Sequence, residues 1–376
     1  MILIAPQTFK GTHDAVTVAS AVARGIRRIW PDAACRELPL ADGGEGTVRA
    51  LVTATAGQYE VARVHDPLGR PIEAVWGRLG DGVTAALEMA AASGLSRLTR
   101  TERDPLRTSS RGTGELILAA AASGAERIIV GLGDSATNDG GAGMARALGY
   151  SFLDRDGREI AEGGEALIRL HRAQGQTDGR ISASRIEVAC DVWSPLLGTQ
   201  GATAVFATQK GAGPGDLVTL ERALTRYAEV LEAFVGRELR DVPGAGAAGG
   251  LGVGLLALLG ATLRSGAELV LDAVQFSAAL QRCDLVITGE GRIDAQTSQG
   301  KVVGAVAKAA RRAGIPVVGI AGDVGPGHDE LGLALVEVAG RGGTTAGVSD
   351  IEDAAARIAV RLQDGIASVE GVDPPK

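Results

Sequence analysis

Acidic residues flanked by glycines recur along the chain, and these are the side chains best suited to chemistry. Four such groups share this character: Asp42–Gly46, Gly133–Gly141, Asp191 and Gly289–Asp294. Carboxylates can hold Mg²⁺ or accept a hydroxyl proton, and glycine lets backbone N–H groups approach an anion closely. A single group of this kind is typical of a tight turn with a solvated aspartate, but four together indicate a ligand site.

Lysine is rare in this chain, and three lysines stand beside glycine. Of 38 basic residues only five are Lys, and the others are Arg. Lys10, Lys210 and Lys301 each adjoin a glycine in a loop-like segment. An ammonium acts as a compact point charge on a phosphate or carboxylate oxygen. The three lysines therefore indicate an anionic ligand, with chance retention on a solvated surface as the alternative.

Two glycine-rich stretches partly fit a dinucleotide-binding loop. Gly244–Gly249 matches the spacing G-x-G-x-x-G, but residues 238–243 before it make a poor strand. Gly131–Ala136 follows a predicted strand, but Asp134 would point a carboxylate at the pyrophosphate. Each pattern is weak evidence alone, so an NAD(P)-dependent oxidoreductase stays an alternative to be tested, as does a non-catalytic sensor of small acids. A Walker loop is absent, because Val302 follows Lys301 where Ser or Thr is required.

The charge and the cysteine and histidine content of the chain limit the kinds of partner and compartment that we expect. The net charge of −7 argues against nucleic acid or an acidic membrane surface as the main partner. Three distant cysteines and four lone histidines form no disulfide or zinc pattern, which fits a reducing compartment. The N-terminus has no basic region before its short apolar run, so we expect a cytoplasmic protein without a signal peptide. The uncharged stretch 243–263 has a strongly apolar part of 13 residues, 251–263, which is short for a bilayer span of ~20 residues.

Hydrophobic periodicity predicts an α/β protein. The predicted strands are 2–5, 35–39, 59–64, 72–79, 83–87, 127–130, 186–190, 285–288, 317–321 and 335–338. The predicted helices are 15–30, 47–56, 114–123, 217–235, 302–313 and 351–367, with Thr12 or Asp14 as the cap of the first. The segments 59–64, 72–79 and 83–87, separated by tight turns, are typical of an antiparallel meander.

The N-terminal pair of strands buries too little surface to be stable alone. We therefore expect it to join the C-terminal strands in one parallel sheet. The predicted fold is a Rossmann-like parallel-sheet domain, residues 1–62 and 284–376, with a second α/β domain inserted into it. The inserted domain, residues 63–283, contains the antiparallel strands, and the active-site cleft is expected between the two.

Taken together, these segments resemble the type 1 glycerate kinase family over roughly residues 2 to 365. The stretches that carry the resemblance occur in the family's order: 4–6 with 9–11, 38–47, 112–116, 133–143, 190–192 with 195–198, 209–212, 244–254, 288–297 and 300–301. Three positions depart from the family pattern. Gln7-Thr8 replaces Asp-Ser, Ser194 replaces Asn, and Ala207-Thr208 replaces Gly-Pro.

The resemblance implies an enzyme that transfers the γ-phosphoryl group of ATP to D-glycerate. The expected product is 2-phospho-D-glycerate, formed in the catabolism of organic acids such as glyoxylate and glycerate. The residues themselves leave open whether the 2- or the 3-hydroxyl reacts, and whether the chain forms a homodimer.

The expected site residues fall into four groups by role. Catalysis is assigned to Asp191, as the base that accepts the hydroxyl proton, and to Lys10. Glycerate is expected at Lys10, Asp42, Gly46 and Thr47. Mg²⁺ is expected at Asp42, Glu45, Glu290 or Asp294. The phosphates of ATP are expected at Ser135, Lys210, Gly244, Gly246, Gly249, Gly250 and Lys301.

Overall fold

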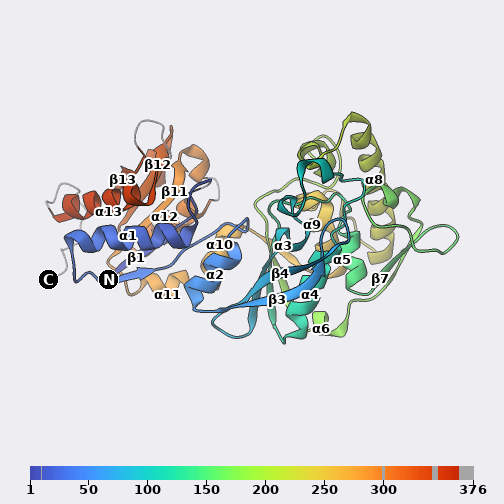
Figure 1. The fold of residues 1–376 in the computed structure, drawn as a ribbon, viewed down its shortest axis with the longest axis horizontal. Coiled ribbons are helices and arrows are strands. Elements are labelled where there is room, and N and C mark those ends of the chain that lie inside the picture. Colours follow the sequence, from blue (N-terminus) through green and yellow to red (C-terminus); the bar gives the residue numbers. More distant parts are fainter. Residues whose placement is uncertain (10, 299–300, 341–345, 364–376) are drawn as a thin grey trace. The chain divides into compact units, whose positions relative to one another are not determined.

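The computed structural model describes residues 1–9, 11–298, 301–340 and 346–363, and Figure 1 shows the course of the chain. Contacts within the chain divide it into two compact units. Unit 1 comprises Met1–Asp42, Arg49–Ala56 and Ser265–Lys376, and unit 2 comprises Gly43–Val48 and Gly57–Arg264. One α/β unit is thus inserted into another, which confirms the predicted fold class. The sequence-based boundaries at 62–63 and 283–284 stay a proposal for where the domains divide.

The sheet of unit 1 is parallel and joins the two ends of the chain. Its strand order is β13-β12-β11-β1-β2 in the described residues. The bounds are β1 (Ile2–Pro6), β2 (Cys35–Glu37), β11 (Leu285–Ile293), β12 (Val317–Val324) and β13 (Leu335–Val338). Ile2 of β1 lies opposite both Leu285 and Cys35, so β1 occupies the middle of the sheet between β11 and β2. The predicted union of N-terminal and C-terminal strands is confirmed.

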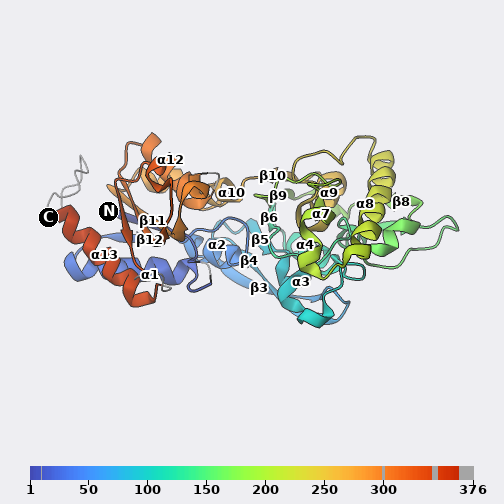
Figure 2. The ribbon, with the colours of Figure 1, turned by 90° about the horizontal axis from the view of Figure 1, so that it is seen from above.

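Helices cover both faces of this sheet. Helices α1 (Ala15–Ile29) and α13 (Val348–Gln363) lie on one face and α12 (Val302–Arg312) lies on the other, as Figure 2 shows. Asp14 caps α1, since its carboxylate accepts the Thr17 N–H at 2.9 Å. Gly25 lets α1 approach α13 closely, because a Cβ there would clash with the Glu352 carbonyl oxygen. The shorter helices are α2 (Thr47–Thr55), α10 (Gly266–Ala273) and α11 (Phe276–Leu280).

Unit 2 is built on a mixed sheet with the order β10-β9-β6-β5-β4-β3. Strands β3 (Gln58–His65), β4 (Pro71–Arg78) and β5 (Thr84–Glu88) are antiparallel, as the meander prediction requires. Strands β6 (Arg127–Gly131), β9 (Arg185–Ala189) and β10 (Thr262–Arg264) then continue in parallel from β5. A separate hairpin of β7 (Tyr150–Leu153) and β8 (Arg172–Gly175) was not predicted.

The helices of unit 2 bury one large core against this sheet. They are α3 (Ala90–Ser93), α4 (Arg111–Ala122), α5 (Ala142–Ala147), α6 (Gly179–Ser182), α7 (Ala202–Phe206), α8 (Pro214–Val235) and α9 (Ala247–Leu258). The uncharged stretch noted in the sequence therefore contains the buried helix α9. None of the helices in the described part of the chain has the length and apolar composition needed to cross a bilayer.

Candidate active site

Three polar side chains line the carboxyl edge of the unit 1 sheet, where open parallel sheets bind ligands. Asp42 follows β2, Gln7 follows β1, and Glu290 lies in β11 one residue beyond the last pair with β1. Gln7 Nε2 donates to Asp42 Oδ2 at 2.7 Å. The sequence predicted Asp42 and Glu290 as site residues but assigned no role to Gln7.

Glu290 is nearly buried, with 6% of its surface exposed. Its carboxylate accepts the Thr297 hydroxyl at 2.7 Å and lies 3.4 Å from Lys301 Nζ. Burial raises the pKa of Glu290, while the bonds from Thr297 and Lys301 act in the opposite direction. The structure therefore brings Glu290 and Lys301 together, and Thr297 is a partner that the sequence did not single out.

Two further acidic candidates are placed differently. Asp294 accepts the Gln296 N–H at 3.0 Å and lies 3.2 Å from Arg292 Nε, so it also stabilises the turn after β11. Glu45 is exposed. Lys10, expected beside the substrate, lies outside the described residues.

Backbone N–H groups at the start of α2 already donate hydrogen bonds to a carboxylate of the protein, that of Glu88. Thr47 is buried and donates its hydroxyl to the Gly44 carbonyl at 2.7 Å. The Val48 N–H donates to Glu88 Oε1 at 2.8 Å, and Gly46 also donates a backbone N–H to Glu88. Burial raises the pKa of Glu88. Helix N-termini favour anions, and here Glu88 takes part of that capacity. The sequence missed Glu88, although its place at the end of a predicted strand was a usable signal.

Lys210 is buried inside unit 2, with 2% of its surface exposed. Its Nζ donates to the Thr137 carbonyl at 2.6 Å and to Ser135 Oγ at 3.3 Å. Burial lowers the pKa of Lys210 to about 7, and the neighbouring charge of Asp139 opposes that shift. The ammonium therefore anchors the loop that carries Ser135.

The glycine-rich stretch before α9 packs against the same loop. Ser135 Oγ donates to the Ala248 carbonyl at 3.2 Å, and Gly140 N donates to the Gly249 carbonyl at 3.1 Å. Ala248, Gly249 and Gly250 have φ angles of 52°, 69° and 86°, a left-handed turn that favours glycine. A Cβ at Gly249 would clash with the Thr137 carbonyl oxygen. The structure thus brings Ser135, Gly249 and Gly250 together with the loop that Lys210 anchors.

Gly244 and Gly246 serve close packing in the same stretch. Gly244 has a φ of 86°, and a Cβ at Gly246 would clash with the Pro195 carbonyl oxygen. These contacts explain why glycine recurs here without a strand before it.

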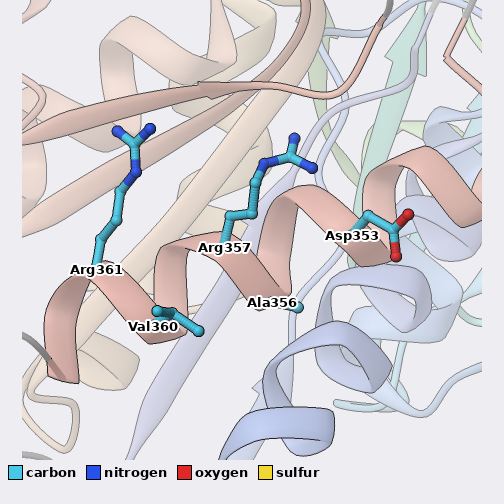
Figure 3. A pocket seen from close by; sticks show the side chains of 5 residues that line it. All are labelled: Asp353, Ala356, Arg357, Val360 and Arg361. Atoms are coloured by element: carbon cyan, nitrogen blue, oxygen red, sulfur yellow. The ribbon is translucent and has the colours of Figure 1, made fainter.

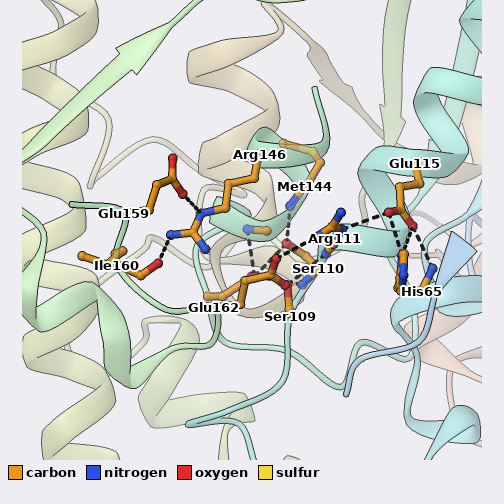
Figure 4. A network of polar contacts seen from close by, with 12 residues as sticks. His65, Ser109, Ser110, Arg111, Glu115, Met144, Arg146, Glu159, Ile160 and Glu162 are labelled. Atoms are coloured by element: carbon orange, nitrogen blue, oxygen red, sulfur yellow. Dashed lines mark hydrogen bonds and ion pairs between the residues drawn. The ribbon is translucent and has the colours of Figure 1, made fainter. Parts of the chain in front are cut away.

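Asp139, which follows the Ser135 loop, connects this loop to the start of helix α4 through hydrogen bonds. Its carboxylate accepts Ser110 N and Ser110 Oγ, both at 2.8 Å, Gly141 N at 3.1 Å and Gly143 N at 3.2 Å. Burial raises the pKa of Asp139, and these four donors oppose the shift. Figure 4 shows how the contacts continue to the surface, where Arg111 lies between Glu115 and Glu162.

Asp191, the expected base, follows β9 in unit 2 and is exposed. The backbone beside it is fixed, since Cys190 N donates to the Arg264 carbonyl at 2.9 Å. Burial raises the pKa of the Cys190 thiol to about 11, which keeps that sulfur protonated and unreactive near neutral pH.

A surface hollow of about 410 Å³ lies along α13 in unit 1 (Figure 3). It is lined by Asp353, Ala356, Arg357, Val360 and Arg361. Arg357 and Arg361 both reach Glu337, at 2.5 and 3.6 Å, so the guanidinium charge is partly neutralised within the protein. This hollow contains none of the predicted site residues.

Comparisons with known proteins agree over most of the chain. The model of the glycerate kinase family matches residues 2–370. A glycerate kinase of Bacillus subtilis (strain 168) is 52% identical over 324 residues, which are 86% of this chain and 85% of that protein. The glycerate 2-kinase of Escherichia coli (strain K12) is 50% identical over 333 residues, 88% of this chain and 87% of that protein. The crystal structure of a candidate glycerate kinase 2 from Salmonella typhimurium LT2 has a TM-score of 0.89 and 47% identity, covering 97% of this chain and 98% of that one.

Proposed function

The chain belongs to the glycerate kinase family, and we propose that it transfers the γ-phosphoryl group of ATP to the 2-hydroxyl of D-glycerate. The products are 2-phospho-D-glycerate and ADP, and the reaction serves cytoplasmic catabolism of organic acids. The observation that carries the choice of hydroxyl is the 50% identity to the Escherichia coli protein named glycerate 2-kinase.

Mg²⁺ fits the carboxylates at the edge of the unit 1 sheet. In the described parts of the chain no three His, Cys, Asp or Glu residues gather as a metal cage. Mg²⁺ at kinase sites is usually held by one or two carboxylates together with phosphate and water, so a cage is not required. Asp42 and Glu290 are our first choice for this role, with Glu45 and Asp294 as alternatives. The ion would neutralise charge on the phosphates when bound.

In our proposal unit 2 contributes the phosphate-binding backbone. Ser135 and the stretch Gly244–Gly250 would form it, and Lys210 holds the Ser135 loop in position from within. Phosphoryl transfer depends on such positioning more than on covalent chemistry by the protein. Lys301, beside Glu290 and 37% exposed, is the described lysine best placed to contact a phosphate oxygen.

Glycerate recognition is assigned to Lys10, Asp42 and the start of α2 at Gly46 and Thr47. Asp191 accepts the proton that the substrate hydroxyl releases. Because Glu88 already engages the start of α2, we expect the cationic groups to contribute more to carboxylate binding than the helix end does.

Phosphorus NMR of the product formed from D-glycerate, ATP and Mg²⁺ tests the proposal directly. A doublet from a phosphate on the C2 oxygen is expected, and a triplet from the C3 oxygen would overturn the regiochemistry but leave the kinase in place. Turnover seen as nicotinamide absorbance, without ADP release, would favour the oxidoreductase alternative instead. Binding of glycerate without ADP release would favour a sensor.

A further inference from the structure

Gln7 contacts Asp42, one of the residues proposed to bind glycerate, and lies at the carboxyl end of the middle strand β1. Its backbone N–H donates to the Gly289 carbonyl at 2.8 Å, which fixes its position beside β11. Its side chain turns toward the end of β2, where Nε2 donates to Asp42 Oδ2 at 2.7 Å. Both the backbone and one end of the amide are therefore held before any ligand binds.

The other end of the amide is an acceptor without a donor. An ionised carboxylate only accepts hydrogen bonds, so contact with Asp42 requires the NH₂ group to face it. The carbonyl oxygen Oε1 then faces away from Asp42. Oε1 is buried and has no hydrogen-bond partner among the described residues. Buried acceptors are rarely left in this state, and an exception calls for a missing donor.

The missing donor cannot be a phosphate or a carboxylate group of the reactants. Phosphate and carboxylate oxygens are acceptors and would be repelled by Oε1. The hydroxyl groups of glycerate are donors. The hydroxyl that receives the phosphoryl group gives up its proton during the reaction, whereas the other hydroxyl keeps its proton throughout. Of the two glycerate hydroxyls, only the second can donate to Oε1 from substrate to product.

We propose that Gln7 is a specificity residue, whose Oε1 accepts a hydrogen bond from the non-reacting hydroxyl of the acceptor substrate. This inference rests on the proposed function, under which that group is the 3-hydroxyl of D-glycerate. A site built to bond a substrate hydroxyl strongly disfavours the analogue that lacks it, because the buried acceptor is then left unpaired. Gln7 therefore selects dihydroxy over monohydroxy acids.

The test compares D-glycerate with D-lactate, which lacks the 3-hydroxyl, in wild type and in Gln7→Met. Methionine has similar length but no amide. Dissociation constants are measured by calorimetry with an unreactive ATP analogue and Mg²⁺, alongside kcat/KM for glycerate. Wild type is expected to bind glycerate roughly 10- to 100-fold more tightly than lactate, and Gln7→Met is expected to reduce that ratio to below about 3-fold. Gln281→Met, which alters an exposed glutamine of unit 1, should leave the ratio unchanged.

Each other outcome has a distinct meaning. An equal loss of affinity for both acids would show that Gln7 acts only by holding Asp42, and would overturn the inference. An unchanged ratio would overturn it as well. Wild type that neither binds nor phosphorylates glycerate would instead refute the proposed function, before any variant is compared. If Gln7→Met does not fold, Gln7→Asn withdraws the same amide by one methylene and should lose the same discrimination.

Discussion

Replacing Lys210 by Met should separate stability from activity, because this lysine is expensive for the fold to bury. A pKa lowered from 10.5 to about 7 corresponds to about 5 kcal/mol, since each factor of ten in proton affinity is worth ~1.4 kcal/mol. Against this, Lys210→Met loses the bonds to Thr137 and Ser135 and leaves a buried carbonyl unpaired, each effect being worth ~1–3 kcal/mol. At pH 7 we therefore expect the free energy of unfolding of Lys210→Met to lie within about 3 kcal/mol of the wild-type value, above or below it.

The pH dependence gives the sharper test. Between about pH 7 and 10.5 the unfolded chain keeps the proton on Lys210 while the native chain has lost it. Raising the pH in this window therefore favours the native state by ~1.4 kcal/mol per pH unit. From pH 7 to pH 9, wild type should gain up to about 3 kcal/mol relative to Lys210→Met, most of it above pH 7.5.

Urea unfolding of both proteins at pH 7 and pH 9, followed by circular dichroism and tryptophan fluorescence, measures this difference. Other groups that titrate at high pH are common to both proteins and cancel. Lys308→Met removes an exposed lysine and should show no such pH-dependent difference. If wild type and Lys210→Met differ by the same free energy at both pH values, Lys210 is not a depressed lysine and the reasoning fails. The variant should also lose at least about tenfold in kcat/KM for ATP, because the Ser135 loop loses its anchor.

Three further predictions concern the other candidates. Glu290→Gln keeps an acceptor for the Thr297 hydroxyl but removes the charge, so the Mg²⁺ concentration for half-maximal rate should rise about tenfold or more; an unchanged Mg²⁺ titration would remove Glu290 from the metal site. Asp191→Asn should lower turnover by roughly 10²-fold in a coupled ADP assay if Asp191 is the base, and a full-rate variant would exclude it. Gly249→Ala combines a left-handed φ with a clash, whereas Gly157→Ala has a φ of 77° with nothing within 4 Å. In thermal unfolding, Gly157→Ala should lower the free energy of unfolding by about 1 kcal/mol, and Gly249→Ala should lower it by at least ~2 kcal/mol more. Equal losses in the two variants would mean that the loop at Thr137 moves to accommodate the added methyl group.

The fold was predictable wherever hydrophobic periodicity dominates. Apart from β10, the strands of both sheets are predicted from their apolar runs, and helices α1, α8 and α12 from the apolar stripe that each buries. The C-terminal part of β11 was not, since Gly289-Glu290-Gly291 has the composition of a loop. Those residues are extended because Glu290 and its neighbours pair with β12, from Glu290 opposite Ala321 to Ile293 opposite Val324. Pairing with a distant strand overrides local propensity there.

The sequence predicts candidate site residues by their type but not the partners that they contact. Asp42, Glu290 and Lys301 were identified from glycine-flanked charges, and the structure places them at one sheet edge or in direct contact. The sequence marks Gln7 only as a departure from the family pattern, because its bond to Asp42 joins residues 35 positions apart. The sequence predicts Lys210 as a phosphate contact, whereas its burial depends on packing that local sequence does not encode.

Hydrogen-bond capacity distinguishes the carboxylates that hold the fold from those that remain available to a ligand. A carboxylate offers about four lone-pair positions. Asp139 accepts four hydrogen bonds from the protein, so few of its lone pairs remain for a ligand. Its role is to connect α4 to the Ser135 loop. Glu290 accepts the Thr297 hydroxyl and lies beside one ammonium, which orients the group but leaves lone pairs for a cation. Both side chains are buried and both have a raised pKa, so burial and titration alone would not tell them apart. The number of hydrogen bonds that each carboxylate already accepts from the protein does distinguish them. For this reason we assign Mg²⁺ to the sheet edge of unit 1 rather than to the more deeply buried Asp139.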